Sequence, residues 1–402
     1  MKVSIIGQGY VGLTIAVAAA GQGHEVTGFD MNSALVEQLN SGKSHIEGVE
    51  SSLVAGLIKS GNYRATTSAS DIAGSEIVVI AVPTPLDKER KPDLAFVESA
   101  CKSIGENLDS AALIINESTS FPGTVRNLIA PTIERYSKKK LNHLFAVSPE
   151  RVDPGNEKFN QSNTPRLYAG LTPEASAKVR EFYSSFCANM VEVSSPEVAE
   201  AAKLFENTFR QVNIALVNEF AQITNALGIS VHETLDAAAT KPYGFMKFNP
   251  SAGVGGHCIP VDPSYLAYVS AGLGVPATFI ERANEVNLEM PKYVVARVIG
   301  DIGALQGKKV LVVGVAYKPN VADTRETPAE LVIAQLKAEG AIVAWHDDVV
   351  GQWHGEKSAP LNGKYDASIV VTLHKSVNVA DVKASAAYVF DTTGKVPGVK
   401  GL

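Results

Sequence analysis

Short apolar runs alternate with helical stretches over the first half of the chain. Lys2–Ile6 and Glu25–Phe29 are the first two runs, and residues 13–20 between them are small and apolar, as in a closely packed helix. Three more runs, each ended by proline or polar residues, cover residues 76–82, 111–115 and Leu144–Val147. Apolar runs of this length are typical of strands that are buried on both faces of a parallel sheet. The pattern therefore predicts a doubly wound α/β domain at the N-terminus.

A long segment without helix breakers follows this domain. Pro196–Leu227 contains no glycine and no second proline, carries apolar residues at helical spacing, and stops at Gly228. It predicts one long helix, which is long enough to connect two domains.

The last part of the chain repeats the strand pattern on a smaller scale. Apolar runs cover residues 309–315, 341–345, 367–372 and 387–390, and Thr327 followed by Pro328 predicts a helix start. The predicted fold class is α/β: two Rossmann-like doubly wound domains joined by a long central helix and a helical middle domain. The predicted domains cover residues 1–195, 196–300 and 301–402.

Composition narrows the class of protein. The chain has 402 residues and a net charge of −6, and it has no strongly basic block, so no nucleic-acid partner is expected. No uninterrupted run of about 18 apolar residues occurs, so no membrane partner is expected either. The cysteines Cys101, Cys187 and Cys258 are odd in number and far apart, which favours reduced thiols and a cytoplasmic location.

A glycine turn directly after the first strand predicts a dinucleotide site. Gly7 would make the tight turn, Gly9 would leave space for a pyrophosphate at the helix N-terminus, and Gly12 would allow close packing of helix on strand. Asp30 ends the second strand, where its carboxylate can accept hydrogen bonds from both ribose hydroxyls and would repel a 2′-phosphate. The predicted cofactor is therefore NAD. An unrelated glycine-rich turn is the alternative for the motif alone.

Polar residues follow three of the predicted strands. Thr84, which comes after Pro83, Thr119 and Glu150 all lie just beyond strand ends. Each alone is typical of a turn or a helix cap. Ligands bind beyond the carboxyl ends of strands in open parallel sheets, so together they predict a rim that faces the cofactor.

Residues 253–263 combine three glycines, two prolines, the thiol of Cys258 and the carboxylate of Asp262. A buried structural cysteine needs no such flanking glycines and prolines, whereas a nucleophile that must reach a substrate carbon needs a sharply shaped loop. A Gly-Pro turn with an incidental cysteine is the alternative.

Two pairs of polar residues outside this loop are further candidates. On the long helix, Lys203 and Asn207 are four residues apart and share a face, among apolar neighbours. They form either a solvated stripe or a pair that stabilises an oxyanion. Lys318 and Arg325 near a strand end of the last domain are either exposed loop charges or ligands of a diphosphate.

These pieces, in this order, resemble the UDP-glucose/GDP-mannose dehydrogenase superfamily along essentially the whole chain, and most of all its UDP-N-acetylhexosamine branch. The segments that carry the resemblance are Gly7-Gln8-Gly9-Tyr10-Val11-Gly12, Val82-Pro83-Thr84-Pro85, Glu117-Ser118-Thr119 with Pro122-Gly123-Thr124, Ser148-Pro149-Glu150-Arg151 followed by Asp153-Pro154-Gly155-Asn156, Glu200-Ala201-Ala202-Lys203 with Asn207, residues 255–263, and Ala316-Tyr317-Lys318 with Asp323-Thr324-Arg325-Glu326. UDP-glucose members carry a second glutamate where this chain has Pro154, so no role of that residue transfers.

The resemblance implies a four-electron, NAD-dependent oxidation of the C6 alcohol of a UDP-sugar to a carboxylate. The Cys258 thiolate would attack the aldehyde formed first, giving a thiohemiacetal and then a thioester that water hydrolyses. Lys203 would lower the pKa of the Cys258 thiol, and Lys203 and Asn207 would stabilise the oxyanion at C6.

The resemblance also implies roles for the remaining candidates. Asp262 would hold the catalytic water, Glu150 would be the base for hydrolysis, and Thr119 would position water or the reacting oxygen next to the cofactor. The cofactor-binding set is Gly7, Gly9, Tyr10, Val11, Gly12, Asp30, Pro83, Thr84 and Thr119. The substrate-binding set is Glu150, Arg151, Lys203, Asn207, Gly255, Lys318 and Arg325.

Several alternatives stay open at this stage. The implied substrate is UDP-N-acetylglucosamine, with the N-acetylmannosamine, N-acetylgalactosamine and glucose nucleotides as the others. A two-electron hydroxyacid dehydrogenase with a structural Cys258, and a non-catalytic sensor of nucleotide sugars, are the rival classes. A homodimer is expected from the resemblance and from the apolar residues of the long helix.

Overall fold

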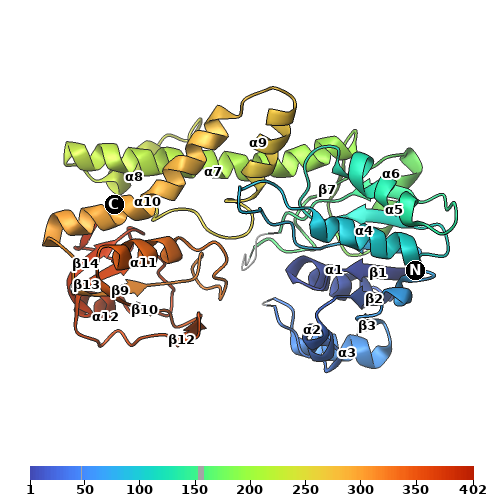
Figure 1. The fold of residues 1–402 in the computed structure, drawn as a ribbon, viewed down its shortest axis with the longest axis horizontal. Helices are drawn as coiled ribbons and strands as arrows, with labels where there is room; N and C mark the ends of the chain where they lie inside the picture. The colour runs from blue at the N-terminus through green and yellow to red at the C-terminus, as the bar shows by residue number, and fades with distance from the viewer. Residues whose placement is uncertain (47, 153–157) are drawn as a thin grey trace. The chain divides into compact units, whose positions relative to one another are not determined.

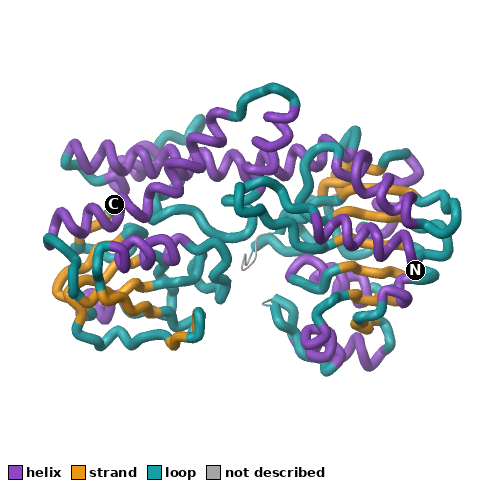
Figure 2. The backbone as a smooth tube through the Cα atoms, viewed as in Figure 1, coloured by secondary structure: helices purple, strands orange, loops and turns teal. Residues whose placement is uncertain are grey.

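The computed structural model describes residues 1–46, 48–152 and 158–402, so the predictions on Asp153, Pro154, Gly155 and Asn156 lie outside the described residues. The chain divides into two compact units, Met1–Phe205 and Glu206–Leu402, which we describe one at a time. Both units combine helices with strands, as Figure 2 shows.

The first unit is built on an eight-stranded sheet with the order β3-β2-β1-β4-β5-β6-β7-β8. Strands β1 to β6 are parallel, β7 runs antiparallel to β6, and β8 is parallel to β7. The strands are β1 (Lys2–Ile6), β2 (Glu25–Phe29), β3 (Tyr63–Thr66), β4 (Ile77–Ile80), β5 (Leu113–Asn116), β6 (Leu144–Val147), β7 (Arg166–Gly170) and β8 (Met190–Glu192). The strand order reverses between β1 and β4, which is the position where doubly wound sheets bind ligands.

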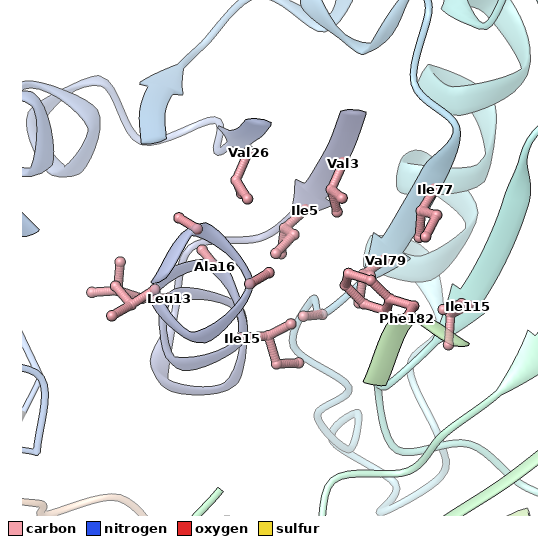
Figure 3. Packing of buried hydrophobic residues seen from close by; sticks show 14 of the residues in the cluster. Val3, Ile5, Leu13, Ile15, Ala16, Val26, Ile77, Val79, Ile115 and Phe182 are labelled. Carbon is pink, nitrogen blue, oxygen red and sulfur yellow. The ribbon is translucent and has the colours of Figure 1, made fainter. Parts of the chain in front are cut away.

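Helices cover both faces of this sheet (Figure 1). They are α1 (Tyr10–Gly21), α2 (Ser33–Asn40), α3 (Ser51–Ser60), α4 (Ala95–Asn107), α5 (Ala130–Tyr136) and α6 (Pro173–Tyr183). Alternate residues of each strand face opposite layers: Ile77 and Val79 of β4 pack with α1 and α6, while Val78 and Ile80 pack with α4 and α5. Figure 3 shows the first layer, in which strand side chains point toward α1 and Phe182. Burial on both faces explains why the strands are almost continuously apolar.

The long helix α7 (Pro196–Leu227) begins in the first unit and continues into the second. The second unit ends in a five-stranded parallel sheet with the order β10-β9-β13-β14-β15. Its strands are β9 (Lys309–Val313), β10 (Ile342–His346), β13 (Tyr365–Val370), β14 (Ala386–Asp391) and β15 (Lys400–Gly401), and β11 (Gln352–Trp353) and β12 (Glu356–Lys357) form a separate pair. The other helices are α8 (Val231–Ala239), α9 (Asp262–Gly272), α10 (Thr278–Ile302), α11 (Pro328–Ala338) and α12 (Val379–Ala384).

In the second sheet, too, alternate residues of a strand face opposite layers of helices. Val310 and Val312 of β9 pack with α10 and α11 on one face, while Leu311 and Val313 pack with α12 on the other. Thr327 accepts a hydrogen bond from the backbone N–H of Ala329 and caps α11, as the sequence predicts. The predicted fold class of parallel α/β sheets joined by a long helix is confirmed.

Among the described residues, no single helix combines the length and apolarity needed to cross a membrane. The bent pair α7 and α8, which meet at 119°, passes that test only when the two are taken together.

Candidate active site

Three glycines shape the turn between β1 and α1, each for a different steric reason. Gly7 has φ +91°, and a Cβ there would lie 2.4 Å from the carbonyl oxygen of Ala81. A Cβ on Gly12 would lie 1.8 Å from the carbonyl oxygen of Gly7, so only glycine allows α1 to approach the turn this closely. Around Gly9, in contrast, no described heavy atom lies within 4 Å of the Cβ position, which leaves the backbone open to a pyrophosphate at the N-terminus of α1.

Asp30 is held against this turn by the backbone. Its Oδ2 accepts the N–H of Gln8 at 2.8 Å, and its Oδ1 accepts the N–H of Asn32 at 2.9 Å. The fully buried Gln8 anchors the turn from within, because its Oε1 accepts the Tyr63 hydroxyl at 2.7 Å. A glycine turn with an open helix N-terminus and a fixed carboxylate at the end of β2 fits the pyrophosphate and ribose of NAD.

The other predicted cofactor residues surround the switch point. Tyr10 and Val11 begin α1 and are half-buried. Beyond β4, Pro83 is exposed and Thr84 is buried. The loop after β4 is tied to the loop after β5, because the Ser118 hydroxyl accepts the N–H of Val82 at 2.9 Å.

The glycine turn offers a direct test by paired substitutions. We expect Gly12→Ala to lose NAD binding and to lower the unfolding temperature, because the new methyl group would overlap the Gly7 carbonyl. Gly9→Ala is the matched control, since its methyl group meets no described protein atom and the protein should fold normally while binding NAD more weakly. Thermal unfolding and NAD titration measure both effects, and equal unfolding temperatures for the two variants would contradict this account.

Lys203 lies near the start of α7 and points to the end of β5. Its side chain is 8% exposed, and its Nζ donates to the Thr119 hydroxyl at 2.8 Å. The structure therefore brings together two predicted site residues that are far apart in the sequence. The solvated stripe considered for Lys203 is wrong, because a solvated lysine would not be buried.

Glu200 fixes the loop that carries Thr119 to α7. Its carboxylate accepts the backbone N–H of Gly123 at 2.7 Å and of Val125 at 3.3 Å, and the Ser120 hydroxyl at 3.0 Å. Burial outweighs these bonds and raises the pKa of Glu200 to about 7. Sequence reasoning assigned Glu200 no separate role. The sequence feature that pointed to it is an acidic residue one helical turn before Lys203.

Glu150 follows β6 and is anchored on both of its oxygens. Its Oε1 accepts the backbone N–H groups of Arg151 and Val152, each at 2.7 Å, and its Oε2 accepts Arg166 Nη2 at 3.0 Å. Burial opposes ionisation, but the Arg166 charge and the two backbone bonds prevail, so the pKa of Glu150 is lowered. The Arg151 guanidinium donates to the carbonyl of Pro165 at 2.9 Å.

In the second unit, the cysteine loop packs on the turn that follows β9. A Cβ on Gly255 would lie 2.8 Å from the carbonyl oxygen of Glu326, and one on Gly256, at φ +86°, would lie 2.7 Å from the Tyr317 ring. The N–H of Gly256 donates to the carbonyl of Arg325 at 3.0 Å. The glycines are thus required by close packing on two sides, and the cysteine that follows them is exposed.

Cys258 sits on the turn that starts α9. Its carbonyl accepts the N–H of Asp262 at 2.8 Å, which places the thiol close to the helix N-terminus. Asp262 is fully buried, and its Oδ2 accepts the Asn207 side-chain amide at 2.7 Å. Cys101 and Cys187, in contrast, are buried, and burial raises the pKa of the Cys101 thiol to about 12. Cys258 is therefore the cysteine whose exposure suits a nucleophile.

Lys318 and Arg325 flank the same loop in the second unit. Lys318 is half-buried, and the Arg325 guanidinium pairs with Asp323 through Nη2 and Oδ2 at 2.6 Å. The Arg325 pKa is raised by the hydrogen bond to Asp323 first and, as a smaller contribution, by the charge of Cys258. Arg325, which the sequence assigns to the diphosphate, thus lies within electrostatic range of Cys258.

One group of acidic and histidine side chains among the described residues has the spacing of a metal site, but its histidine is already hydrogen-bonded on both ring nitrogens. Ligand atoms of Asp347, Asp348 and His374 lie within 4.8 Å of one another. The Nδ1 of His374 accepts the N–H of Asn320 at 2.8 Å, so its Nε2 carries the proton and donates to Asp347 at 2.9 Å. Both ring nitrogens are therefore already in use.

The glycine turn at the switch point of a parallel sheet defines an NAD-binding α/β protein. Comparison with family models matches the NAD binding domain of the UDP-glucose/GDP-mannose dehydrogenase family over residues 1–187, its central domain over 197–289 and its UDP binding domain over 311–396. The chain belongs to this family, and the predicted family, class of enzyme and cofactor are confirmed.

Individual relatives cover most of the chain. UDP-N-acetyl-D-glucosamine 6-dehydrogenase of Pseudomonas aeruginosa is 34% identical over 93% of this chain and 90% of its own length. UDP-N-acetyl-D-mannosamine dehydrogenase of Methanococcus maripaludis is 36% identical over 86% of this chain and 79% of its own length. The solved structure of the UDP-D-ManNAc dehydrogenase of Pyrococcus horikoshii superposes with a TM-score of 0.89 at 29% identity, covering 100% of this chain and 99% of that one.

Proposed function

We propose that this enzyme oxidises the C6 alcohol of a UDP-sugar to the carboxylate in two NAD-dependent steps, with UDP-N-acetylglucosamine as the first candidate substrate. The observation that carries the proposal is that Cys258 is exposed on a glycine-rich turn. Asp262, which follows it by four residues, is buried and hydrogen-bonded to Asn207. A dehydrogenase that stopped at the aldehyde would need no exposed thiol there.

The reaction balances as follows. Bound NAD accepts one hydride in each oxidation, so two NAD molecules are consumed per sugar. In the first oxidation C6 loses a hydride and its hydroxyl loses a proton, which gives the aldehyde. The Cys258 thiolate then bonds to the aldehyde carbon, and loss of a second hydride from that carbon leaves a thioester. Water adds to the thioester, the C–S bond breaks, and the thiolate and the sugar carboxylate are released together with the two protons of the water.

The polar residues of the candidate site have distinct roles in this reaction. Lys203, held by Thr119, stabilises negative charge on the C6 oxygen, and Asn207 is proposed to donate to the same oxygen. Asp262 orients Asn207 and holds the water. Glu150, which is kept ionised, accepts the proton of the attacking water. Arg151, Gly255, Lys318 and Arg325 are proposed to contact the UDP-sugar.

The choice of sugar rests on the relatives. One is named for UDP-N-acetyl-D-glucosamine and another for UDP-N-acetyl-D-mannosamine, so both N-acetylated sugars are candidates. The chain's own motif, with His257 beside Cys258, favours the N-acetylhexosamine branch.

The test is NADH production with a panel of the glucose, N-acetylglucosamine, N-acetylmannosamine and N-acetylgalactosamine nucleotides. We expect two NADH per sugar consumed, and the highest kcat/KM with an N-acetylated sugar. One NADH per sugar with accumulating aldehyde would refute the four-electron reaction. Ligand binding without turnover on any sugar would make the chain a sensor.

We also propose that the enzyme is a cytoplasmic homodimer that binds neither nucleic acid nor membranes. Apolar side chains that are exposed on two long helices support the dimer: Phe205, Leu216 and Ile223 on α7, and Phe279 and Leu288 on α10. Such an apolar surface is typical of a subunit interface. Light scattering gives the molar mass in solution, and a monomer at micromolar concentration would refute this assembly.

A further inference from the structure

Arg166, on the antiparallel strand β7, is a buried cation to which sequence reasoning assigned no role. Its side chain is 4% exposed and reaches residues just beyond the ends of β5 and β6. Its Nη1 donates to Glu117 Oε1, beyond β5, and to the Ser148 hydroxyl, beyond β6, at 3.0 Å. Its Nη2 donates to Glu150 at 3.0 Å. One guanidinium therefore joins two carboxylates that come from different strand ends.

The charges in this cluster do not cancel, and burial makes that imbalance costly. Were both acids ionised, Glu117 and Glu150 would carry two negative charges against one positive charge on Arg166, and the Glu117 side chain is fully buried. Burial raises the pKa of Glu117 to about 7, although Arg166 and the Tyr183 hydroxyl, which donates to Glu117, both favour its ionised form. Glu150 behaves in the opposite way, because its pKa is lowered. Near neutral pH, Arg166 therefore acts chiefly as the counter-ion of Glu150.

The cluster also fixes the orientation of the Glu150 carboxylate. Arg166 occupies Oε2 while two backbone N–H groups occupy Oε1, so the carboxylate cannot rotate without breaking a bond on either side. Arg166 is itself held in place by stacking, since its guanidinium carbon lies 4.5 Å from the centre of the Tyr183 ring. A lysine in this position would have no planar fork to share between two carboxylates and a hydroxyl.

We propose that Arg166 is a positioning residue for Glu150, and that Glu117 is a second anchor that holds the Arg166 guanidinium in place. The inference rests on the proposed function, in which Glu150 accepts a proton during hydrolysis of the Cys258 thioester. Arg166 does not touch the sugar in this scheme. It keeps Glu150 ionised and fixes the orientation of its carboxylate, and Glu117 accepts a hydrogen bond from the same guanidinium.

Substitutions of Arg166 and of Glu117 predict different pH effects. Removing the cation should raise the pKa of Glu150, so Arg166→Met should move the acidic limb of the hydrolysis rate to higher pH. Glu117→Gln replaces a carboxyl group whose raised pKa keeps it protonated where Glu150 titrates, so it should leave that limb in place. The other described ionisable groups that face the cluster are Tyr183 on α6, Cys187 just after it, and Lys203 on α7. Because they are unchanged in both variants, a shift in Arg166→Met alone reports on the Arg166 charge.

The experiment follows NADH and the protein mass after rapid mixing of the full-length enzyme with NAD and the best sugar of the panel. We expect Arg166→Met to release two NADH per site in a fast burst and then to turn over about 100-fold more slowly, with a sugar adduct trapped on Cys258. The hydrolysis rate of Arg166→Lys should fall about 10-fold. Arg64→Met is the control, because Arg64 on β3 forms an exposed ion pair with Asp71, and its loss should leave the rate unchanged.

A second variant covers the case in which Arg166→Met fails to fold with two unbalanced buried acids. Arg166→Met combined with Glu117→Gln leaves Glu150 as the single charged member of the cluster and should fold, yet remain slow in hydrolysis. The inference is overturned if either methionine variant that folds hydrolyses the adduct at the wild-type rate, or if the acidic limb of Arg166→Met does not move to higher pH. The proposed function fails separately, when the wild-type enzyme gives one NADH per sugar or forms no adduct on Cys258.

Discussion

Replacing Cys258 by alanine is expected to lower acid formation by at least about 1000-fold while NAD affinity stays within about twofold of wild type. Without the thiolate, the aldehyde carbon has no sulfur to bond to, and the second oxidation lacks its covalent intermediate. The glycine turn that fits NAD lies in the first unit, and Cys258 lies in the second. Product analysis by mass and NAD titration measure the two effects.

Cys258→Ser separates shape from reactivity. A serine hydroxyl has nearly the same size, but it is far less ionised at neutral pH, so we expect a loss of similar size. Cys101→Ala is the control, because the Cys101 thiol is fully buried and its pKa is raised to about 12. It should cost stability but leave kcat unchanged. Acid formation by Cys258→Ala at the wild-type rate would show that Cys258 is structural.

Replacing Lys203 by methionine has the second largest expected effect, a fall in kcat of about 100- to 1000-fold. Methionine retains the apolar length of the side chain, so the buried position stays filled while the charge near Thr119 is lost. The developing negative charge on the C6 oxygen then lacks its cation. Steady-state kinetics should show the loss in kcat, with little change in the KM for NAD.

Lys178→Met is the control for Lys203→Met. Lys178 forms an exposed pair with Glu174 at 3.7 Å on α6, so removing its charge should change neither kcat nor stability by a measurable amount. If Lys203→Met retained wild-type kcat, the buried bond to Thr119 would be structural, and the assignment of the oxyanion cation would be wrong.

Much of the fold is predictable because its signals are local. The strands Lys2–Ile6, Glu25–Phe29 and Leu144–Val147, and the helix Pro196–Leu227, have the predicted boundaries. Strands β7 and β8 were not predicted. β7 runs antiparallel to β6 and begins with Arg166, whose burial depends on partners elsewhere in the chain.

The site divides in a similar way. The glycine turn and the loop around Cys258 could be interpreted from the spacing of their glycines along the sequence. The charged contacts could not. The Lys203–Thr119 bond joins residues 84 positions apart, and the Arg166–Glu117 pair joins residues 49 positions apart.

The sequence by itself thus determined the class of fold, the NAD-binding turn and the candidate nucleophile, because apolar periodicity and glycine positions act over a few residues. Only the tertiary structure decided which carboxylates are ionised and which cation holds them. Burial and pairing set those charges, and both depend on side chains that meet only when strands β5, β6 and β7 come together.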